Sequence, residues 1–276
     1  MCTKCYTPPC LSRKFSCPFL AGQSGQNTGT SLVIERALIL AAGRGVRMGP
    51  RGRGIPKGFI EVGGTPLIVR SLGLLAAAGI RDAVIVTGHL AENFGALRPI
   101  PGLNVSLVHN PDYAVKGSFE SLRVGLGHVA APFLLLESDI IYEPRALQAV
   151  LTAAHDSVIL TSGPTGAGDE VYVWADGQES DATFRGMSKV KSTHADVPFG
   201  ELVGILKLAD AVVQQLLCSA ADVPADGDYE SALVRASRES PISCIRVNNL
   251  LWGEIDDEAM LANVETRLWP ALQMKS

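Results

Sequence analysis

The residues best suited to chemistry lie in one stretch, Ala37 to Lys57, with the sequence ALILAAGRGVRMGPRGRGIPK. An apolar run that ends in a glycine-rich turn exposes backbone N–H groups, which can bind phosphate oxygens. Arg47 and Lys57 add positive charge, and the stretch contains no acidic residue. Guanidinium and ammonium groups neutralise phosphate anions. The sequence therefore predicts a phosphate-binding loop between Gly43 and Lys57.

Two familiar phosphate loops do not fit this stretch. Gly43-x-Gly45-x-x-Met48 begins like a dinucleotide fingerprint but lacks the third glycine of that motif. At the end of the next predicted strand, Thr87-Gly88-His89 stands where the fingerprint needs an acid to hold a ribose. No Gly-Lys-Ser/Thr follows the turn, which excludes a Walker loop.

Acidic residues follow two other apolar runs. Leu134–Leu136 leads into Glu137-Ser138-Asp139, and Trp252-Gly253 leads into Glu254-Ile255-Asp256. Magnesium prefers carboxylate, phosphate and water oxygens, and phosphoryl transfer depends on such neutralising charge. Both acidic segments are therefore candidates for a Mg²⁺ site.

These groups need a scaffold that brings strand ends together, and the rest of the chain predicts one. After residue 35, apolar β-branched runs alternate with helical patterns. The first part has predicted strands at 36–40, 83–87, 105–108 and 133–136, a long loop at 43–57, and predicted helices at 65–78, 92–97, 118–126 and 144–154. This order predicts an α/β fold, with a Rossmann-like mixed, mostly parallel sheet flanked by helices. Such sheets bind ligands at the carboxyl ends of their strands.

The second part of the chain is richer in β-structure. Its predicted strands are 158–161, 171–174, 184–190, 201–206 and 252–256, and its predicted helices are 209–217, 229–236 and one from Glu258. No repeat or linker interrupts the pattern. We therefore expect one domain over residues 34–276, with a small β-rich acceptor or lid region.

Composition limits the possible partners. The formal net charge is −4, which argues against wholesale nucleic-acid binding. No apolar run approaches the roughly 18 residues of a membrane span, so no membrane partner and a cytoplasmic location are expected. Residues 1–33 are rich in Ser, Gly, Thr and Pro and are expected to be a disordered extension. A zinc site from Cys2, Cys5, Cys10 and Cys17 is the alternative, and their irregular spacing disfavours it.

The motifs now support a family resemblance. Leu40-Ala41-Ala42-Gly43-x-Gly45-x-Arg47-Met48, then Pro56-Lys57 and Val62-Gly63-Gly64-Thr65-Pro66, resemble the nucleotidyltransferase superfamily. The resemblance implies attack by an acceptor oxygen on the α-phosphorus of a nucleoside triphosphate, with release of pyrophosphate. It also implies that Asp139 and Asp256 hold Mg²⁺, with Glu254 as a less certain ligand.

Later motifs are similar to those of phosphocholine and 2-aminoethylphosphonate cytidylyltransferases. They are Tyr113-Ala114-x-x-Gly117-Ser118-Phe119, Glu137-Ser138-Asp139-Ile140 and Glu254-Ile255-Asp256-Asp257. Gly117-Ser118 departs from the Asn-Asn that phosphocholine enzymes tend to have there. The resemblance implies a catalytic set of Arg47, Lys57 and Lys189, and nucleotide contacts from Leu40, Ala41, Ala42, Gly43, Gly45, Arg47, Lys57, Gly88, Gly117 and Ser118.

The expected partners are CTP and a small phosphonate or phosphate acceptor, with a second copy of the chain as a further candidate. Lys189, in the segment FRGMSKVK, is predicted to pair with the anionic end of the acceptor. Aromatic rings and carboxylates can hold an ammonium tail, and we name Tyr113, Glu170 and Tyr229 for this role. Phe119, Tyr172, Trp174, Asp169, Asp228 and Glu230 are the other candidates. Lys116 and Arg123 would instead receive an anionic tail.

Three other functions stay open on the sequence. A sugar-1-phosphate nucleotidyltransferase is disfavoured by the Glu-Ser-Asp-Ile segment and the modest length. An isoprenoid-pathway cytidylyltransferase is disfavoured because that family's His-Asp-Ala-Ala-Arg-Pro segment is absent. A catalytically inactive nucleotide-binding regulator is disfavoured because both acidic segments and Lys57 are present.

Overall fold

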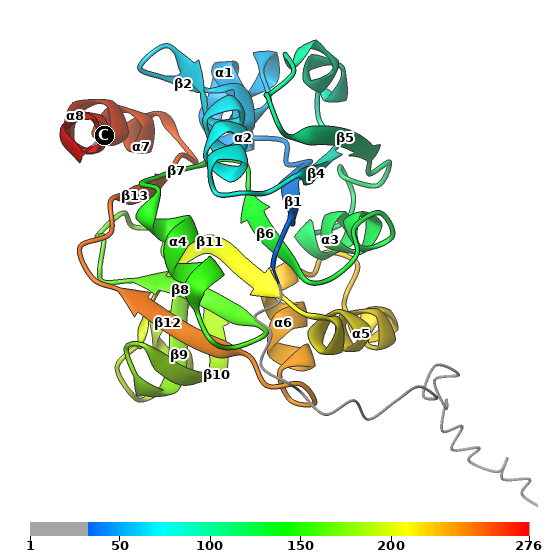
Figure 1. Cartoon of the computed structure of the whole chain (residues 1–276), viewed down its shortest axis with the longest axis vertical. Helices are drawn as coiled ribbons and strands as arrows, with labels where there is room; N and C mark the ends of the chain where they lie inside the picture. Colours follow the sequence, from blue (N-terminus) through cyan, green and yellow to red (C-terminus); the bar gives the residue numbers. More distant parts are fainter. Residues whose placement is uncertain (1–32, 276) are drawn as a thin grey trace, which may run out of the picture. The chain divides into compact units, whose positions relative to one another are not determined.

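The computed structural model describes residues 33–275, and Figure 1 labels most of its helices and strands. The strands are β1 (Arg36–Ala41), β2 (Glu61–Val62), β3 (Thr65–Pro66), β4 (Asp82–Thr87), β5 (Asn104–His109), β6 (Phe133–Glu137), β7 (Ile140–Tyr142), β8 (Val158–Ser162), β9 (Tyr172–Gln178), β10 (Asp181–Ser188), β11 (Gly200–Leu208), β12 (Ser243–Val247) and β13 (Trp252–Glu254). The α-helices are α1 (Gly49–Gly54), α2 (Leu67–Ala77), α3 (Ser118–Leu126), α4 (Arg145–Thr152), α5 (Asp210–Cys218), α6 (Tyr229–Ala236), α7 (Glu258–Asn263) and α8 (Trp269–Lys275). A π-helical turn, Val264–Leu268, joins α7 to α8.

The expected extension at residues 1–33 and its cysteines lie outside the described residues, apart from Val33. The described residues all fall within one compact unit. No helix in the described part of the chain combines the length and apolar character needed to span a bilayer.

The central sheet has nine strands in the order β5-β4-β1-β6-β11-β8-β12-β10-β9. From β5 to β6 every neighbouring pair is parallel, which requires the helical crossovers that the sequence predicts. Beyond β6 the pairs are antiparallel, except for the parallel pair β8–β12. In the register of β1 with β6, Leu40 pairs with Glu137. The phosphate loop and the first acidic segment therefore leave the sheet side by side.

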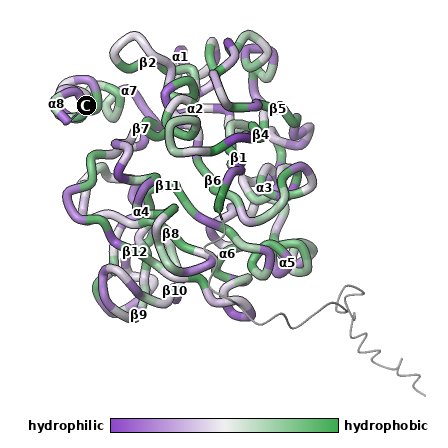
Figure 2. Tube along the Cα trace, viewed as in Figure 1, coloured by the Kyte–Doolittle hydropathy of each residue, from purple (hydrophilic) through white to green (hydrophobic). Residues whose placement is uncertain are grey.

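Apolar side chains on the two faces of the sheet build two cores. Ile39 and Leu134 belong to the face covered by α2 and α4. Leu38 and Leu135 belong to the opposite face, covered by α3, α5 and α6. These three helices contact one another and lie side by side in Figure 1. A strand that is buried on both faces must be apolar along its length. This accounts for the continuous run of apolar residues in β6, which is coloured green for hydrophobic in Figure 2. A third core joins Met48 of the phosphate loop to Ile255 and the C-terminal helices.

Several predicted boundaries were wrong. The expected loop at 43–57 contains the short helix α1 and a 3-10 turn at Val46–Met48. Thr65 does not cap a helix, because Thr65–Pro66 forms strand β3 and α2 begins at Leu67. The segment 92–97 is part of a 3-10 helix, Ala91–Ala96, and the last predicted strand ends at Glu254 rather than at Asp256. Strands β2, β7 and β12 were not predicted. Each has five residues or fewer, which is too few for a distinct periodic pattern.

Candidate functional site

The phosphate loop is closed by contacts between its own glycines. Gly45 has a left-handed backbone (φ 57°), and Met48 N donates to the Gly45 carbonyl at 3.0 Å. A Cβ atom at Gly52 would lie 2.1 Å from the Gly45 oxygen, so only glycine allows α1 to fold back onto the loop. His89 Nε2 lies 3.0 Å from the Gly52 carbonyl and ties this turn to the end of β4.

Lys57 lies between the two acidic segments. Its Nζ lies 2.7 Å from Asp139 Oδ2 and also pairs with Asp256 Oδ1. The Asp256 side chain is fully buried, and Ile255 N donates to the Asp139 carbonyl at 2.9 Å, which holds the segments together. Burial would lower the pKa of Lys57, but the charges of Asp139 and Asp256 outweigh it and raise the pKa. Lys57 therefore stays protonated at neutral pH.

Arg47 and Lys189 meet at Asp169, which belongs to the loop between β8 and β9. Arg47 pairs with Asp169 Oδ2, and Lys189 Nζ lies 3.1 Å from the same oxygen. Arg47 also pairs with Asp256. Burial opposes ionisation of Asp169, but hydrogen bonds from Arg47 and Lys189 lower its pKa to about 2. The tertiary structure thus links all three predicted catalytic cations through aspartates. Sequence reasoning considered Asp169 only as one of several carboxylates for a cationic tail.

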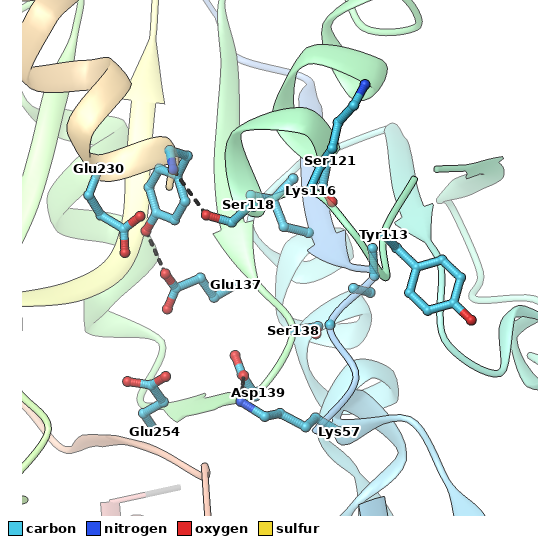
Figure 3. A pocket seen from close by; sticks show the side chains of 16 residues that line it. Lys57, Tyr113, Lys116, Ser118, Ser121, Glu137, Ser138, Asp139, Glu230 and Glu254 are labelled. Carbon is cyan, nitrogen blue, oxygen red and sulfur yellow. Dashed lines mark hydrogen bonds and ion pairs between the residues drawn. The ribbon is translucent and has the colours of Figure 1, made fainter. Parts of the chain in front are cut away.

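A cluster of acids lies beside these cations. Carboxylate oxygens of Glu137, Asp139 and Glu254 lie within 4.8 Å of one another, and Figure 3 shows these side chains around one opening. Burial, together with Asp139, raises the pKa of Glu137 to about 7, and burial beside the other acids raises that of Glu254 to about 10. Hard oxygen donors gathered this closely fit Mg²⁺. From the segment Glu137-Ser138-Asp139, the sequence analysis singled out Asp139 as the ligand and not Glu137.

Two pockets meet at the acid cluster. The smaller has a volume of about 230 Å³ and the larger about 1000 Å³, and both are lined by Glu137, Glu230 and Glu254. Of the predicted nucleotide contacts, those lining the smaller pocket are Leu40, Ala41, Ala42, Gly43, Lys57, Gly117 and Ser118. Gly45, Arg47 and Gly88 do not line it. Gly88 instead gives Tyr113 room, because a Cβ there would lie 2.7 Å from the Tyr113 side chain.

The predicted acceptor residues divide between the pockets. Lys189 and Glu170 line the larger one. Tyr113 and Tyr229 line the smaller one and not the larger, and Figure 3 shows Tyr113 on the far side from Glu230. The Tyr229 hydroxyl donates to Glu137, and its backbone N–H donates to Ser118 Oγ at 3.0 Å. Tyr229 and Ser118 therefore fix the start of α6 against α3 and hold Glu137 in place.

Some alternative acceptor contacts do not fit the structure. Trp174 is fully buried and Phe119 is 5% exposed, so both belong to the core. Lys116 pairs with Asp112 at 2.7 Å and with Glu120 at 3.3 Å, and Arg123 pairs with Glu120 at 2.6 Å. Of these two cations, Lys116 lines the smaller pocket and Arg123 lines neither pocket.

Gly204 provides a test of how tightly Glu137 is held. Gly204 lies in β11 with φ 78°, and a Cβ there would lie 2.5 Å from Glu137 Oε2. Gly166 has a similar φ of 68° but open space around it. We expect Gly166→Ala to cost about 1–2 kcal/mol from backbone strain alone. Gly204→Ala should cost about 1–3 kcal/mol more, because it also displaces the carboxylate.

Urea unfolding of the two alanine variants measures this difference. Equal losses of unfolding free energy would contradict the close contact between Gly204 and Glu137.

Comparisons with known proteins show which class of protein the chain resembles. Residues 37–168 match the family model of the MobA-like NTP transferase domain. The inositol-1-phosphate CTP transferase from T. maritima shares the fold, with a TM-score of 0.73 at 17% identity, over 88% of this chain and 97% of that chain. This likeness confirms the predicted α/β fold with a mixed sheet flanked by helices. The family match confirms, over residues 37–168, the resemblance to the nucleotidyltransferase superfamily that the motifs predict.

Its relatives in sequence include cytidylyltransferases. A CMP-5'-(3-aminopropyl)phosphonate synthase of Streptomyces rubellomurinus is 34% identical over 153 residues, which are 54% of this chain and 24% of that protein. A 2-aminoethylphosphonate cytidylyltransferase of Lancefieldella rimae is 33% identical over 125 residues, which are 42% of this chain and 50% of that protein. The chain thus spans between about a quarter and a half of the length of these relatives.

Proposed function

We propose that the chain transfers CMP from CTP to a small phosphonate or phosphate acceptor and releases pyrophosphate. The observation that carries the proposal is the shared contact of Arg47 and Lys189 with Asp169 Oδ2. A cation from the phosphate loop and a cation from the β-rich region thereby lie at one carboxylate, which lines the larger pocket. Two anionic substrates need such an arrangement, because their phosphate groups must approach each other closely. The cytidylyltransferase relatives support CTP as the donor.

In this reaction the acceptor oxygen attacks the α-phosphorus of CTP in line. The bond from the α-phosphorus to the oxygen that bridges it to the β-phosphorus breaks, and that oxygen leaves with pyrophosphate. The acceptor oxygen is already anionic, so no general base is required. Lys57 and Arg47 neutralise the charge that develops on the triphosphate, and Lys189 orients the anionic end of the acceptor. The backbone from Leu40 to Gly43, at the start of the phosphate loop, lines the smaller pocket, in which we place the nucleotide.

Mg²⁺ is the proposed cofactor. When bound, it would neutralise and orient phosphate oxygens. Asp139 and Asp256 stay the predicted ligands, and Glu137 and Glu254 lie close enough to Asp139 to complete the set. Lys57 pairs with both Asp139 and Asp256 and so holds these two carboxylates in place.

A pyrophosphate-release screen tests the proposal. It combines each nucleoside triphosphate and Mg²⁺ with 2-aminoethylphosphonate, phosphocholine, 2-hydroxyethylphosphonate, phosphonoformate and several sugar-1-phosphates. We expect turnover with CTP and a phosphonate or phosphocholine. Turnover only with sugar phosphates would overturn the acceptor class. Tight CTP binding without any pyrophosphate release would instead identify a regulator.

Lys189→Ala separates the acceptor site from the nucleotide site. Because Lys189 lines the larger pocket, its loss should raise KM for the acceptor by about 10-fold or more, the typical effect of removing a charged hydrogen-bond donor. The KM for CTP should change much less. Initial rates with each substrate varied in turn measure both values, and an equal change in the two would contradict the role of Lys189.

A further inference from the structure

The larger pocket offers far more space than a minimal acceptor needs. Its volume of about 1000 Å³ lies at the upper end of the range for pockets that enclose drug-sized ligands. A two-carbon aminophosphonate or phosphocholine is much smaller than such ligands. Lys189 and the shared acids Glu137, Glu230 and Glu254 all line this pocket. A small acceptor of this kind, with its anionic end bound to Lys189, would therefore leave most of the pocket's volume unfilled.

The C-terminal segment builds a wall of this pocket with mixed character. Its apolar lining residues come from the end of the chain and include Leu251, Met260, Val264, Leu268 and Ala271. Arg267 is the cation that this segment contributes. The loop between β8 and β9 forms another wall and contributes Asp169 and Glu170. The same segment also contributes the polar side chains of Asp257 and Asn263, and apolar patches beside such polar groups suit a carbon chain with polar substituents.

Two buried polar atoms of residues lining this pocket lack a partner among the described residues. Glu230 Oε2 accepts no hydrogen bond, and Trp252 Nε1 donates none. A buried polar group without a partner is unfavourable, because it has lost its hydrogen bonds to water. Glu230 suits an N–H group of a ligand, because a carboxylate is an acceptor of hydrogen bonds. Figure 3 shows its carboxylate near Glu137, where the two pockets adjoin.

We propose that the acceptor is an aminoalkyl phosphonate or phosphate whose chain continues beyond its amine, along the wall formed by the C-terminal helices. Lys189 binds the anionic end, Glu230 accepts a hydrogen bond from the amine, and the remaining chain packs against α7 and α8. This inference rests on the proposed cytidylyl transfer and specifies the class of acceptor. The larger pocket is then a specificity site for the substituent on the amine.

The test uses 2-aminoethylphosphonate and its N-propyl and N-hexyl derivatives, with CTP, Mg²⁺ and the full chain. Pyrophosphate release gives kcat/KM, and calorimetry without CTP gives the affinity for each compound. We expect the N-alkyl compounds to exceed the parent compound by at least about 10-fold in both measurements, as added methylenes in an apolar pocket allow. Equal or weaker binding and turnover of the N-alkyl compounds would overturn the inference but leave the proposed function intact. If no compound releases pyrophosphate but the N-alkyl compounds bind more tightly, the proposed function fails and the pocket assignment stands.

Two phenylalanine variants of α7 provide a matched pair. Ala259 and Ala262 are both exposed, but only Ala259 lines the larger pocket. Ala259→Phe should remove the preference for the N-alkyl compounds, because the ring fills space that the chain would occupy. Ala262→Phe should keep the preference at the wild-type ratio. A preference that survives in Ala259→Phe, with the thermal midpoint unchanged, would also overturn the inference.

Discussion

Replacing Lys57 by Met should lower kcat for pyrophosphate release by about 1000-fold, the upper range for losing one group that stabilises developing charge. Lys57 lines the smaller pocket and contacts both Asp139 and Asp256. The methionine keeps much of the side-chain volume but removes the positive charge. Steady-state rates at saturating CTP and acceptor measure the effect.

The same substitution should also destabilise the fold. It leaves the buried Asp256 with Arg47 as its remaining cation, and breaking a buried ion pair typically costs about 3–5 kcal/mol. Urea unfolding measures this loss, and rates are to be compared at a temperature where circular dichroism shows a folded protein. Arg235→Ala removes an exposed cation from α6 and serves as the control, with little expected change. A Lys57→Met protein that is folded and retains wild-type kcat would contradict the proposed role.

Asp139→Asn should lower turnover by at least about 100-fold, because it removes a carboxylate from the proposed metal site. Asparagine preserves the shape of the side chain and can still accept a hydrogen bond from Lys57. We therefore expect a thermal midpoint close to that of the wild type. The Mg²⁺ concentration that gives half-maximal rate should rise.

Titration of Mg²⁺ in the rate assay separates a metal ligand from a purely structural residue. Asp210→Asn changes an exposed carboxylate at the start of α5 and serves as the control. Unchanged turnover and unchanged Mg²⁺ dependence in Asp139→Asn would exclude Asp139 as a ligand.

The sequence predicted those parts of the fold that depend on local pattern. Strand β1 and the glycine turn after it are adjacent in the chain, so their chemistry was visible without the tertiary structure. Helix α3 was predicted with its observed bounds, because its apolar residues recur with helical spacing. Helix α1 was missed, because GPRGRG has poor helix propensity and its position is fixed by distant contacts. Arg51, for example, makes a bidentate ion pair with Glu258 of α7, at 2.8 and 3.2 Å.

By itself, the sequence predicted the class of site: a phosphate loop with Lys57, followed by acids at strand ends. Only the tertiary structure decided which charges meet. Asp169 lies in a loop without periodic pattern, and its contact with Arg47 and Lys189 follows from how the β8–β9 loop packs. Glu137 joins Asp139 and Glu254 because strand register and the glycine at position 204 leave it space. Local propensity acts over a few residues, whereas ion pairs and pockets depend on the packing of distant segments, which no local pattern encodes.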